Sequence, residues 1–480
     1  MRRAGCPRDG PLPPAFGYAA VLGPTRHRAA GAGLNSRRRY GRSRGERAAG
    51  VVRKGPGRER ARDLADWRRA LVVAFFATGL GMATWVSRTP AIRDAIGAST
   101  GEMGLVIAGL SVGSVVGIAA GGRFVVRRGA RFVVVLGMAA IVLGLLVAAL
   151  GVVVGEGVLV AAGLACFGYG MGSGEIGLNV GGVELEIAVG RSVVPGLHGW
   201  YSLGVFAGGL AGLGANSAGV PVFAHLAAVA LLAATGSRWL VARLPPLTVP
   251  APADEPAPGV AGTDGGGRAW LDGRLLGLGV IILGMALAEG SANDWLPLIV
   301  VDGFGRSAAL GSVVYALFGL SMAVGRLSGG AAIDRFGRAP VIRAGALTAA
   351  AGIGLVAVAP DLVWGVAGTL LWGLGASLGF PVVLSAAGDD PVHAARRATA
   401  VASAGYAAFL AGPPVLGFLA EEVGLRDAIL VVLAAVLATV PCSGAVRPPG
   451  RPASRHAPPP AGPGAVPEAG PPPTADGRRP

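Results

Sequence analysis

The sequence predicts an all-α integral membrane protein whose twelve transmembrane helices form two six-helix halves. Of its 480 residues, 52% are hydrophobic and only 14% are charged, whereas a soluble domain has about 25% charged residues. Apolar stretches of about 20 residues follow one another through most of the chain, and each is long enough to cross a bilayer core of about 30 Å as a helix. Similar motifs also recur in the two halves at a nearly constant spacing. Together these features exclude a soluble enzyme.

The chain begins with an Arg/Gly/Pro-rich tail, residues 1–66, that we expect to be disordered. This tail lacks the apolar segment of a signal peptide. It has almost no aromatic residues that could stack on bases, so we expect no nucleic-acid partner. Its composition also suggests the hypothesis that the start codon is mis-assigned and that the native protein begins further downstream.

Twelve apolar spans follow, six on each side of a polar segment. In the N-terminal half, residues 67–243, the predicted spans are 69–88, 103–122, 132–153, 158–182, 197–219 and 221–243. Residues 244–272 are rich in Pro and Gly, and we expect them to form a cytoplasmic linker. In the C-terminal half, residues 273–446, the predicted spans are 274–296, 308–330, 340–359, 362–386, 398–420 and 427–446. We expect the Pro-rich tail after them, residues 447–480, to be disordered.

The loop charges predict the orientation of these spans. An even number of spans places both termini on one side of the membrane. If that side is the cytoplasm, thirteen loop arginines face inward, and only Arg88, Arg93, Arg306 and Arg426 face outward. Because cytoplasmic loops of membrane proteins are enriched in basic residues, we expect both termini in the cytoplasm.

Glycine motifs indicate that the two halves repeat each other. Gly122-x6-Gly129 recurs as Gly330-x6-Gly337, 208 residues later. The glycines at 168, 170 and 174 recur at 373, 375 and 379, which is 205 residues later. With six spans per half, the halves have parallel topology and are related by an axis along the membrane normal. The glycine content, 82 of 480 residues, also favours closely packed helices.

Several strings in the sequence resemble the major facilitator superfamily (MFS). Residues 330–338, GAAIDRFGR, are similar to the G-x-x-x-D-R-x-G-R signature between spans eight and nine of that family. WVSRTPAIRDAI at 85–96, GSGEIGLNVGGVELE at 172–186 and AEGSANDWLPLIVVDG at 288–303 look like its YbjJ-like or MosC-like bacterial inner-membrane branch. The resemblance implies a monomeric transporter with the MFS fold in the bacterial plasma (inner) membrane. The branch's association with sugar-like and inositol-derived compounds suggests a sugar, polyol or related metabolite as the solute.

The signature loop is expected to act as a cytoplasmic gate. In the family, the acid of this loop latches the halves by pairing with neighbouring helix ends and arginines. Val126 occupies the position of the acid in the first half, so only Asp334 can form such a latch. The predicted gating residues are Gly330, Asp334, Arg335, Gly337 and Arg338.

Two carboxylates inside the spans, Glu175 and Glu289, are the candidates for proton coupling. Ionisable residues within a membrane are costly and usually face a cavity. Glu175 precedes Asn179 by one helical turn in span four, and Glu289 precedes Asn293 by one turn in span seven. At about 1.5 Å per residue, Glu175 falls toward the cytoplasmic half of the bilayer and Glu289 toward the outer half. The resemblance also favours Glu175, because the fucose-proton symporter of the superfamily carries its proton on a carboxylate in span four.

Neighbouring polar residues are candidates for solute binding. These candidates are Trp85, Arg88, Asn179, His198, Tyr201, Asn293 and Asp294. Arg88 can bind an anionic or hydroxylated solute with two hydrogen bonds, and Trp85 can stack on the apolar face of a sugar. The structural alternatives are a snorkelling arginine, an interfacial tryptophan, or an ion pair of Glu289 or Asp294 with an arginine such as Arg88 at the outer rim.

Four glycines after Tyr201 in span five, at 204, 208, 209 and 212, resemble the antiporter motif of the superfamily. Gly209, however, replaces the proline that defines that motif. We therefore interpret these glycines as a surface for close helix packing.

These features predict a secondary active transporter, not an enzyme, that moves a small solute by alternating access and is coupled to protons. The sequence contains no Walker A loop and no H-E-x-x-H motif. Cys6, Cys166 and Cys442 are too far apart for a zinc motif, and we expect no metal and no cofactor. The expected partners are a small-molecule substrate, the lipid bilayer and protons. Efflux of drugs or metabolites is the main alternative, and a non-transporting membrane sensor is the alternative from another class.

Overall fold

The computed structural model describes residues 57–190, 193–245, 272–389 and 393–448, and all regular secondary structure in these ranges is helical. The predicted linker and C-terminal tail lie almost entirely outside the described residues. Most of the predicted N-terminal tail also lies outside them. Residues 57–66, which we expected to be disordered, instead form the first turns of α1 (Gly57–Val86). Ala, Leu, Glu and Arg in this segment are strong helix formers, which explains the difference.

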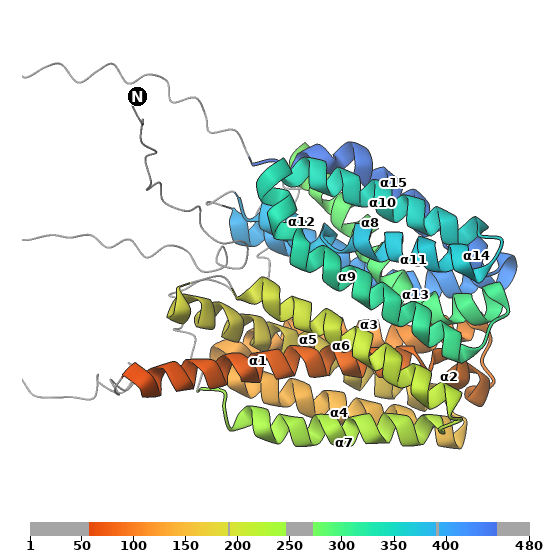
Figure 1. Cartoon of the computed structure of the whole chain (residues 1–480), viewed down its shortest axis with the longest axis horizontal. Helices are drawn as coiled ribbons and strands as arrows, with labels where there is room; N and C mark the ends of the chain where they lie inside the picture. The colour runs from red at the N-terminus through yellow and green to blue at the C-terminus, as the bar shows by residue number, and fades with distance from the viewer. Residues whose placement is uncertain (1–56, 191–192, 246–271, 390–392, 449–480) are drawn as a thin grey trace, which may run out of the picture. The chain divides into compact units, whose positions relative to one another are not determined.

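Each predicted span corresponds to one helix or to consecutive helical segments (Figure 1). The N-terminal half contains α1, α2 (Thr89–Ile96), α3 (Thr100–Arg128), α4 (Ala130–Val154), α5 (Gly157–Val189), α6 (Val194–Ser217) and α7 (Val222–Val241). The C-terminal half contains α8 (Gly273–Leu298), η3 (Ile299–Gly303), α9 (Ala308–Phe336), α10 (Arg338–Val358), α11 (Leu362–Ala376), α12 (Gly379–Ala387), α13 (Ala394–Val423), α14 (Leu425–Ala428), α15 (Leu430–Cys442) and η4 (Ser443–Val446).

Eleven helical segments in the described part of the chain are long and apolar enough to cross a membrane. The twelfth predicted span is α6, whose 24 residues include His198, Trp200, Tyr201 and several glycines. These residues lower its hydropathy without shortening it. The prediction of an all-α membrane protein with twelve transmembrane helices is therefore confirmed.

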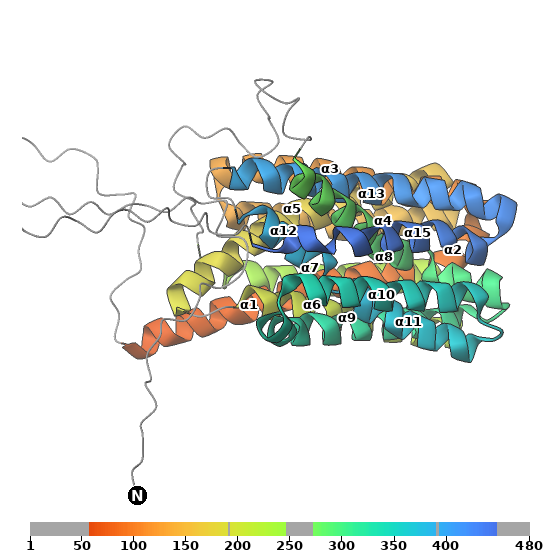
Figure 2. The same cartoon turned by 90° about the horizontal axis from the view of Figure 1, so that it is seen from above.

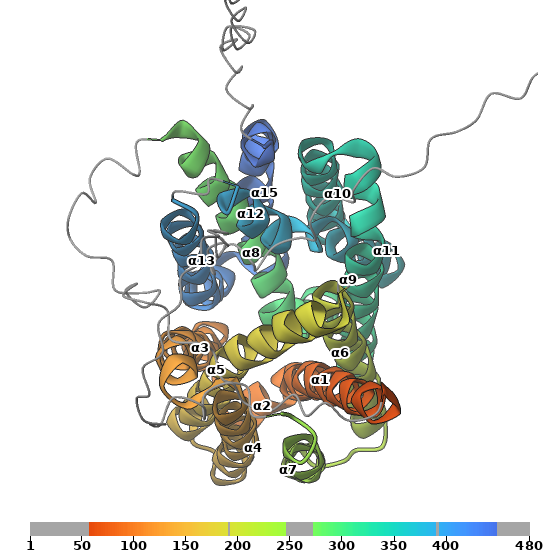
Figure 3. The same ribbon diagram turned by 90° about the vertical axis from the view of Figure 1, so that its left-hand side faces the viewer.

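The helices run between two ends of the bundle that we name by their connections. The linker end carries the last turn of α7 and the first turn of α8, and the far end carries α2, η3 and α14 (Figures 1 and 2). Viewed from the linker end, α1 to α7 lie on one side of the bundle and α8 to α15 on the other (Figure 3).

Two glycines make the same sharp turn at the linker end of each half. Gly129 joins α3 directly to α4, and Gly337 joins α9 directly to α10. Both have a φ of +82°, which L side chains rarely adopt. The two turns are 208 residues apart, so the sequence repeat corresponds to a repeated backbone geometry.

Glycines also bring the helices of each half into backbone contact, as the composition predicted. A β-carbon added to Gly113 of α3 would lie 1.9 Å from the carbonyl oxygen of Ala165 in α5. In the second half, a β-carbon at Gly352 of α10 would lie 2.3 Å from the backbone nitrogen of Trp372 in α11. Such close approach is typical of membrane helices, which associate by packing small residues.

Direct contacts join the two halves at the far end. Arg93 of α2 forms an ion pair with Asp302 of η3. Asn216 of α6 donates from Nδ2 to Oγ of Ser312 in α9 at 2.9 Å. Between α3 and α13, a β-carbon at Gly104 would lie 2.7 Å from the carbonyl oxygen of Pro413. The far end is therefore closed in this conformation.

Candidate solute and proton site

An ion pair between α8 and α9 lies deep within the helical bundle. Nη2 of Arg326 donates to Oε1 of Glu289 at 2.8 Å, and the two side chains are only 15% and 17% exposed. Nη1 of Arg326 donates to Oγ of Ser202 in α6 at 3.1 Å. Glu289 follows the start of α8 by 16 residues, which corresponds to about 24 Å of helix. Arg326 therefore connects the two halves within the membrane-spanning part of the chain.

Glu175 of α5 faces this ion pair from the other half. Its side chain is exposed, and within the described part of the chain it makes no hydrogen bond and no ion pair. Glu175 nevertheless interacts electrostatically with both Glu289 and Arg326. It must therefore point between the halves, where a carboxylate without a bonding partner can be reached by water or a solute.

Other polar side chains of α5 and α6 bond one another or interact electrostatically with Glu175. Nε2 of His198 lies 3.1 Å from Oδ1 of Asn179, and the imidazole ring packs edge-on against Phe75 with 5.1 Å between ring centroids. Tyr201 is within electrostatic range of Glu175, Glu289 and Arg326. The structure thus places four predicted site residues, Glu175, Asn179, His198 and Tyr201, on two adjacent helices.

A second polar group lies on α8 and α9. The hydroxyl of Tyr315 donates to Oδ1 of Asn293 at 3.0 Å, and Tyr315 is fully buried. Asp294, next to Asn293, is only 6% exposed. No hydrogen bond or ion pair connects Asp294 to any residue that the structure describes, so the predicted pairing of this aspartate with an arginine is absent.

Arg88 and Trp85 contribute to packing in this conformation. The guanidinium of Arg88 donates to Oδ1 of Asn216 at 2.7 Å and to the carbonyl oxygen of Val220 at 2.6 Å. It thereby fixes the last turns of α6 and does not pair with Glu289, which binds Arg326 instead. Trp85 is 0% exposed, so both faces of its ring are covered by protein. Neither side chain has the accessible surface that it would need to stack on or bind a solute in this conformation.

The glycines of α6 pack helices together, as we interpreted them from the sequence. A β-carbon at Gly204 would lie 2.1 Å from the carbonyl oxygen of Phe76 in α1. A β-carbon at Gly209 would lie 2.7 Å from Cβ of Ala316 in α9. α6 is therefore held closely against both halves.

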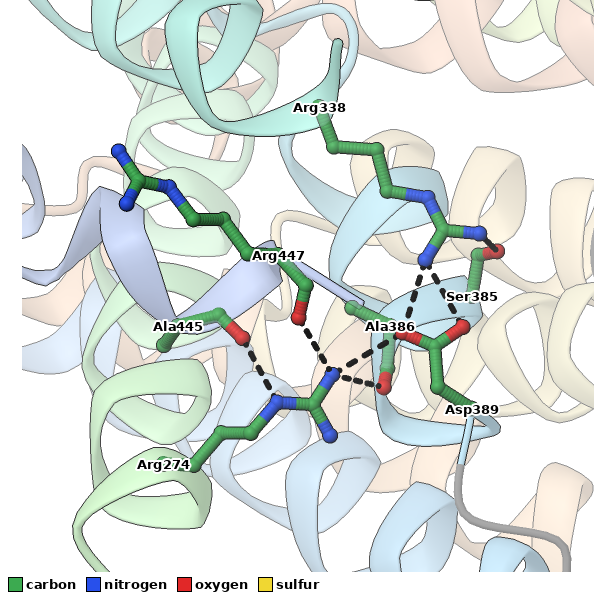
Figure 4. Close-up of polar contacts among 7 residues, drawn as sticks. All are labelled: Arg274, Arg338, Ser385, Ala386, Asp389, Ala445 and Arg447. Carbon is green, nitrogen blue, oxygen red and sulfur yellow. Dashed lines mark hydrogen bonds and ion pairs between the residues drawn. The ribbon is translucent and has the colours of Figure 1, made fainter. Parts of the chain in front are cut away.

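The signature loop forms an ion pair that differs from the predicted latch. Asp334 is exposed and forms no ion pair with a residue that the structure describes. Arg338 instead donates from Nη1 to both carboxylate oxygens of Asp389, each at 2.9 Å, and Arg274 donates to Oδ2 of Asp389 at 3.0 Å (Figure 4). The acid that binds the signature arginine therefore comes from the end of α12.

This Asp389 group connects four segments of the C-terminal half at the linker end. Nε of Arg274 also donates to the carbonyl oxygen of Ala445 in η4 at 3.0 Å, and Nη2 of Arg338 donates to Oγ of Ser385 in α12 at 3.1 Å (Figure 4). The starts of α8 and α10 are thus bonded to the ends of α12 and η4. Among the other predicted gating residues, Gly337 forms the turn into α10, Arg335 stacks on Phe336 with 5.2 Å from Cζ to the ring centroid, and a β-carbon at Gly330 would meet nothing within 4 Å.

Sequence reasoning missed Arg326 and Asp389. Arg326 stands in the apolar segment VVYALFGLSMAVGR, and the rule that identified Glu175 applies equally to it. Asp389 has no comparable signal, because it lies just after a span where a surface aspartate is common. Within the described ranges, no group of three or more His, Cys, Asp and Glu side chains is placed to hold a metal ion.

The fold agrees with comparisons to known proteins. The sequence model of the Major Facilitator Superfamily matches residues 16–184 and 196–413. The chain belongs to this superfamily and is a multi-pass membrane transporter of that family.

Two curated relatives are similar over most of their length. An uncharacterised MFS-type transporter of Yersinia pestis is 31% identical over 378 residues, which cover 77% of this chain and 93% of the relative. Membrane protein MosC of Rhizobium meliloti is 26% identical over 374 residues, which cover 76% of this chain and 86% of MosC. The resemblance to the MosC-like bacterial branch is confirmed.

Two solved transporter structures share the fold. The nucleoside transporter NupG superposes with a TM-score of 0.64 at 14% identity and covers 79% of this chain and 99% of its own. The fucose:proton symporter FucP of E. coli superposes with a TM-score of 0.52 at 16% identity. The match covers 79% of this chain and 98% of the FucP chain. At these identities the likeness concerns the fold alone.

Proposed function

We propose that the protein is a secondary active transporter that moves a sugar, polyol or related small metabolite across the bacterial inner membrane by alternating access, coupled to protons. The observation that carries this proposal is the arrangement of Glu175, Glu289 and Arg326 between the two halves. Two carboxylates and one guanidinium lie within electrostatic range of one another, and Glu175 has no bonding partner among the described residues. In this proposal the protein works as a monomer with both termini in the cytoplasm.

Glu175 is suited to carry the coupled proton. A carboxylate gains or loses a proton when its surroundings alternate between water and protein. Glu175 is exposed in this conformation, and we propose that it exchanges its proton with water at the linker end. The arginines of that end assign it to the cytoplasm. When the halves rearrange and the far end opens, the same carboxylate faces the opposite compartment.

Glu289 and Arg326 are suited to respond to the solute. Arg326 already bonds Glu289 of one half and Ser202 of the other. A hydroxylated solute that offers oxygens to Arg326 competes with these bonds, and it can also bond Tyr201. Solute binding would thereby change the link between the halves, which is what coupling transport to a conformational change requires.

The side chains at the site favour a neutral hydroxylated solute over an anion. With both glutamates ionised, two negative charges face one positive charge, so a carboxylate or phosphate group would be repelled. Asn, Ser, Tyr and His side chains provide hydrogen-bond donors and acceptors for hydroxyl groups.

The experiment that tests this proposal measures the external pH of an unbuffered suspension of de-energised cells expressing the chain. Pulses of sugars, polyols and inositol derivatives are added one at a time. Alkalinisation with one compound, lost in Glu175→Gln and kept in Glu156→Gln, supports proton-coupled uptake. Glu156 is the matched control, because it is an exposed carboxylate at the far end of the same helix. If no compound changes the external pH although the protein is expressed, proton-coupled uptake is contradicted, and efflux becomes the next activity to assay.

A further inference from the structure

Five arginines at the linker end of the N-terminal half have no acidic partner among the residues that the structure describes. They are Arg127 and Arg128 at the end of α3, Arg131 at the start of α4, Arg238 in the last turn of α7, and Arg243 just after it. None of the five forms an ion pair with a residue that the structure describes. All but Arg131 are exposed.

In the C-terminal half, three arginines at the same end are paired with acids. Asp389 accepts from both Arg274 and Arg338, and Asp272 pairs with Arg397. Three arginines there are neutralised by the protein itself. Among the described residues, the five arginines of the N-terminal half have no such acid, and the same is true of Arg335 and Arg343 in the C-terminal half.

The five arginines belong to one continuous surface. Nη2 of Arg131 donates to the carbonyl oxygen of Val241 at 2.8 Å, which ties the start of α4 to the end of α7. These two helices lie side by side at the edge of the bundle (Figure 3). Arg128, from the preceding turn, stacks on Phe132 of α4 with 5.1 Å from Cζ to the ring centroid.

This surface lies next to exposed apolar side chains of α7. On α7, Leu231 and Leu232 are 67% and 58% exposed, as expected for side chains that contact lipid tails. Arg238 and Trp239 follow them by seven residues and so lie on the same helix face, two turns nearer the linker end. Arg243 stacks on Trp239 with 4.1 Å from Cζ to the ring centroid. A tryptophan with adjacent arginines is typical of the membrane interface.

We propose that this surface, Arg127, Arg128, Arg131, Arg238 and Arg243, binds the headgroups of anionic phospholipids. The phosphate of such a lipid supplies the missing negative charge, and its acyl chains lie along the exposed leucines of α7. A soluble phosphate ion would gain nothing from those leucines, so the position of the surface favours a lipid. The proposal depends on the membrane orientation given above but not on the solute or on proton coupling.

The test measures lipid selectivity of the purified full chain in vesicles by fluorescence. The vesicles contain dioleoyl phosphatidylcholine with increasing amounts of dibrominated phosphatidylglycerol, and the measured signal is the quenching of Trp239, isolated by comparison with Trp239→Phe. We expect phosphatidylglycerol to bind about tenfold or more tightly than dibrominated phosphatidylcholine at low salt, since each arginine near the surface contributes about fivefold. The preference should shrink as salt is added.

Charge variants distinguish lipid binding at this surface from a general attraction of the protein to anionic vesicles. Arg238→Gln with Arg243→Gln should bring the two lipids to nearly equal affinity, whereas Arg306→Gln, an exposed arginine at the far end, should leave the preference unchanged. Equal binding of both lipids to the native chain would overturn the proposal, as would a preference that survives the double variant. Loss of the preference in millimolar inorganic phosphate but not in chloride of the same ionic strength would also overturn it, because it would indicate a soluble-anion site.

Discussion

At the site, the bonds that connect the two halves are made by a single side chain, that of Arg326. Its guanidinium is held by Glu289 within its own half and by Ser202 across the interface. A buried ion pair is costly to form, and removing one partner leaves the other charge uncompensated. The same property makes the pair sensitive to any solute that replaces one of these bonds.

Single neutralisation of this pair should therefore destabilise the protein more than double neutralisation. We expect Glu289→Gln or Arg326→Gln to lower the free energy of unfolding by about 3 kcal/mol each, and the double variant to regain most of that loss. Denaturant unfolding of the purified proteins in detergent measures all three. Losses that simply add in the double variant would show that the two side chains do not form a stabilising pair.

Neutralisation of Glu175, unlike that of Glu289 or Arg326, should affect transport and leave stability almost unchanged. Because it is exposed and bonds no described residue, Glu175→Gln should change the free energy of unfolding by less than about 0.5 kcal/mol. It should still abolish uphill accumulation of the solute while allowing solute exchange. Radiolabelled exchange and accumulation in the same proteoliposomes separate the two effects, and unchanged accumulation would remove Glu175 from the coupling mechanism.

Prediction of the site from sequence succeeded where a polar residue stood out against an apolar span. Glu175, Asn179, His198 and Tyr201 were found in this way and lie on adjacent helices. Arg88 and Asp294 were found by the same rule, yet Arg88 is buried and bonded to Asn216 and Val220, and Asp294 is buried without a described partner. The direction that a side chain takes from its helix depends on packing against other helices, which the sequence of one helix does not specify.

At the scale of the helices, glycine spacing sets which surfaces can touch. The repeated glycines predicted close packing, and the structure shows backbone contacts between α3 and α5 and between α10 and α11. The extent of each helix was harder to predict. The polar residues before residue 67 read as a tail, but they continue α1 as a helix beyond its apolar part.

Gly113 and Gly122 of α3 provide a matched pair for testing this packing. A β-carbon at Gly113 would lie 1.9 Å from a backbone oxygen of α5, whereas one at Gly122 would meet nothing within 4 Å. We expect Gly113→Ala to destabilise the protein by about 3 kcal/mol and Gly122→Ala to have no such effect. Thermal unfolding in detergent provides the comparison, and equal melting temperatures would contradict the backbone contact.

The start of α8 should give the stability a defined pH dependence. Burial alone would raise the pKa of Asp272, but hydrogen bonds from the backbone of α8 and the adjacent Arg397 guanidinium outweigh it, so this pKa lies below its ordinary value. The ionised carboxylate therefore stabilises the folded protein by less than about 1 kcal/mol at any pH above the pKa of about 3.9 that it has in the unfolded chain. This contribution disappears as the pH falls through the lower pKa of the folded state. The difference in melting temperature between the native chain and Asp272→Asn should be constant from pH 7 to 5 and vanish at lower pH. A difference that grows on acidification would contradict this assignment.

At the scale of the whole molecule, the two halves meet firmly at the far end. Arg93 pairs with Asp302, and α3 packs against α13 through glycine and proline backbones. Alternating access requires these contacts to separate in every transport cycle. The closed far end and the exposed Glu175 are consistent with a conformation whose site is reached from the linker end.

Cross-linking should test whether the far end must open. Arg93→Cys and Asp302→Cys are introduced after Cys6, Cys166 and Cys442 have been replaced by serine, and the pair is joined by a short bis-methanethiosulfonate, which forms a reducible disulfide with each thiol. We expect transport to stop and to recover after reduction, because the halves can no longer separate. Arg93→Cys with Asp94→Cys places both thiols on one helix and should have no effect when cross-linked. Transport that continues with the Arg93 and Asp302 positions joined would argue against opening at this end.

The most direct test of proton-coupled alternating access is solute accumulation by purified protein in proteoliposomes under an imposed proton gradient. With the solute identified by the pH assay, the native chain should accumulate it against its concentration gradient, and accumulation should collapse when a protonophore is added. Accumulation that is unaffected by the protonophore, or the absence of any solute flux by folded protein, would contradict the account.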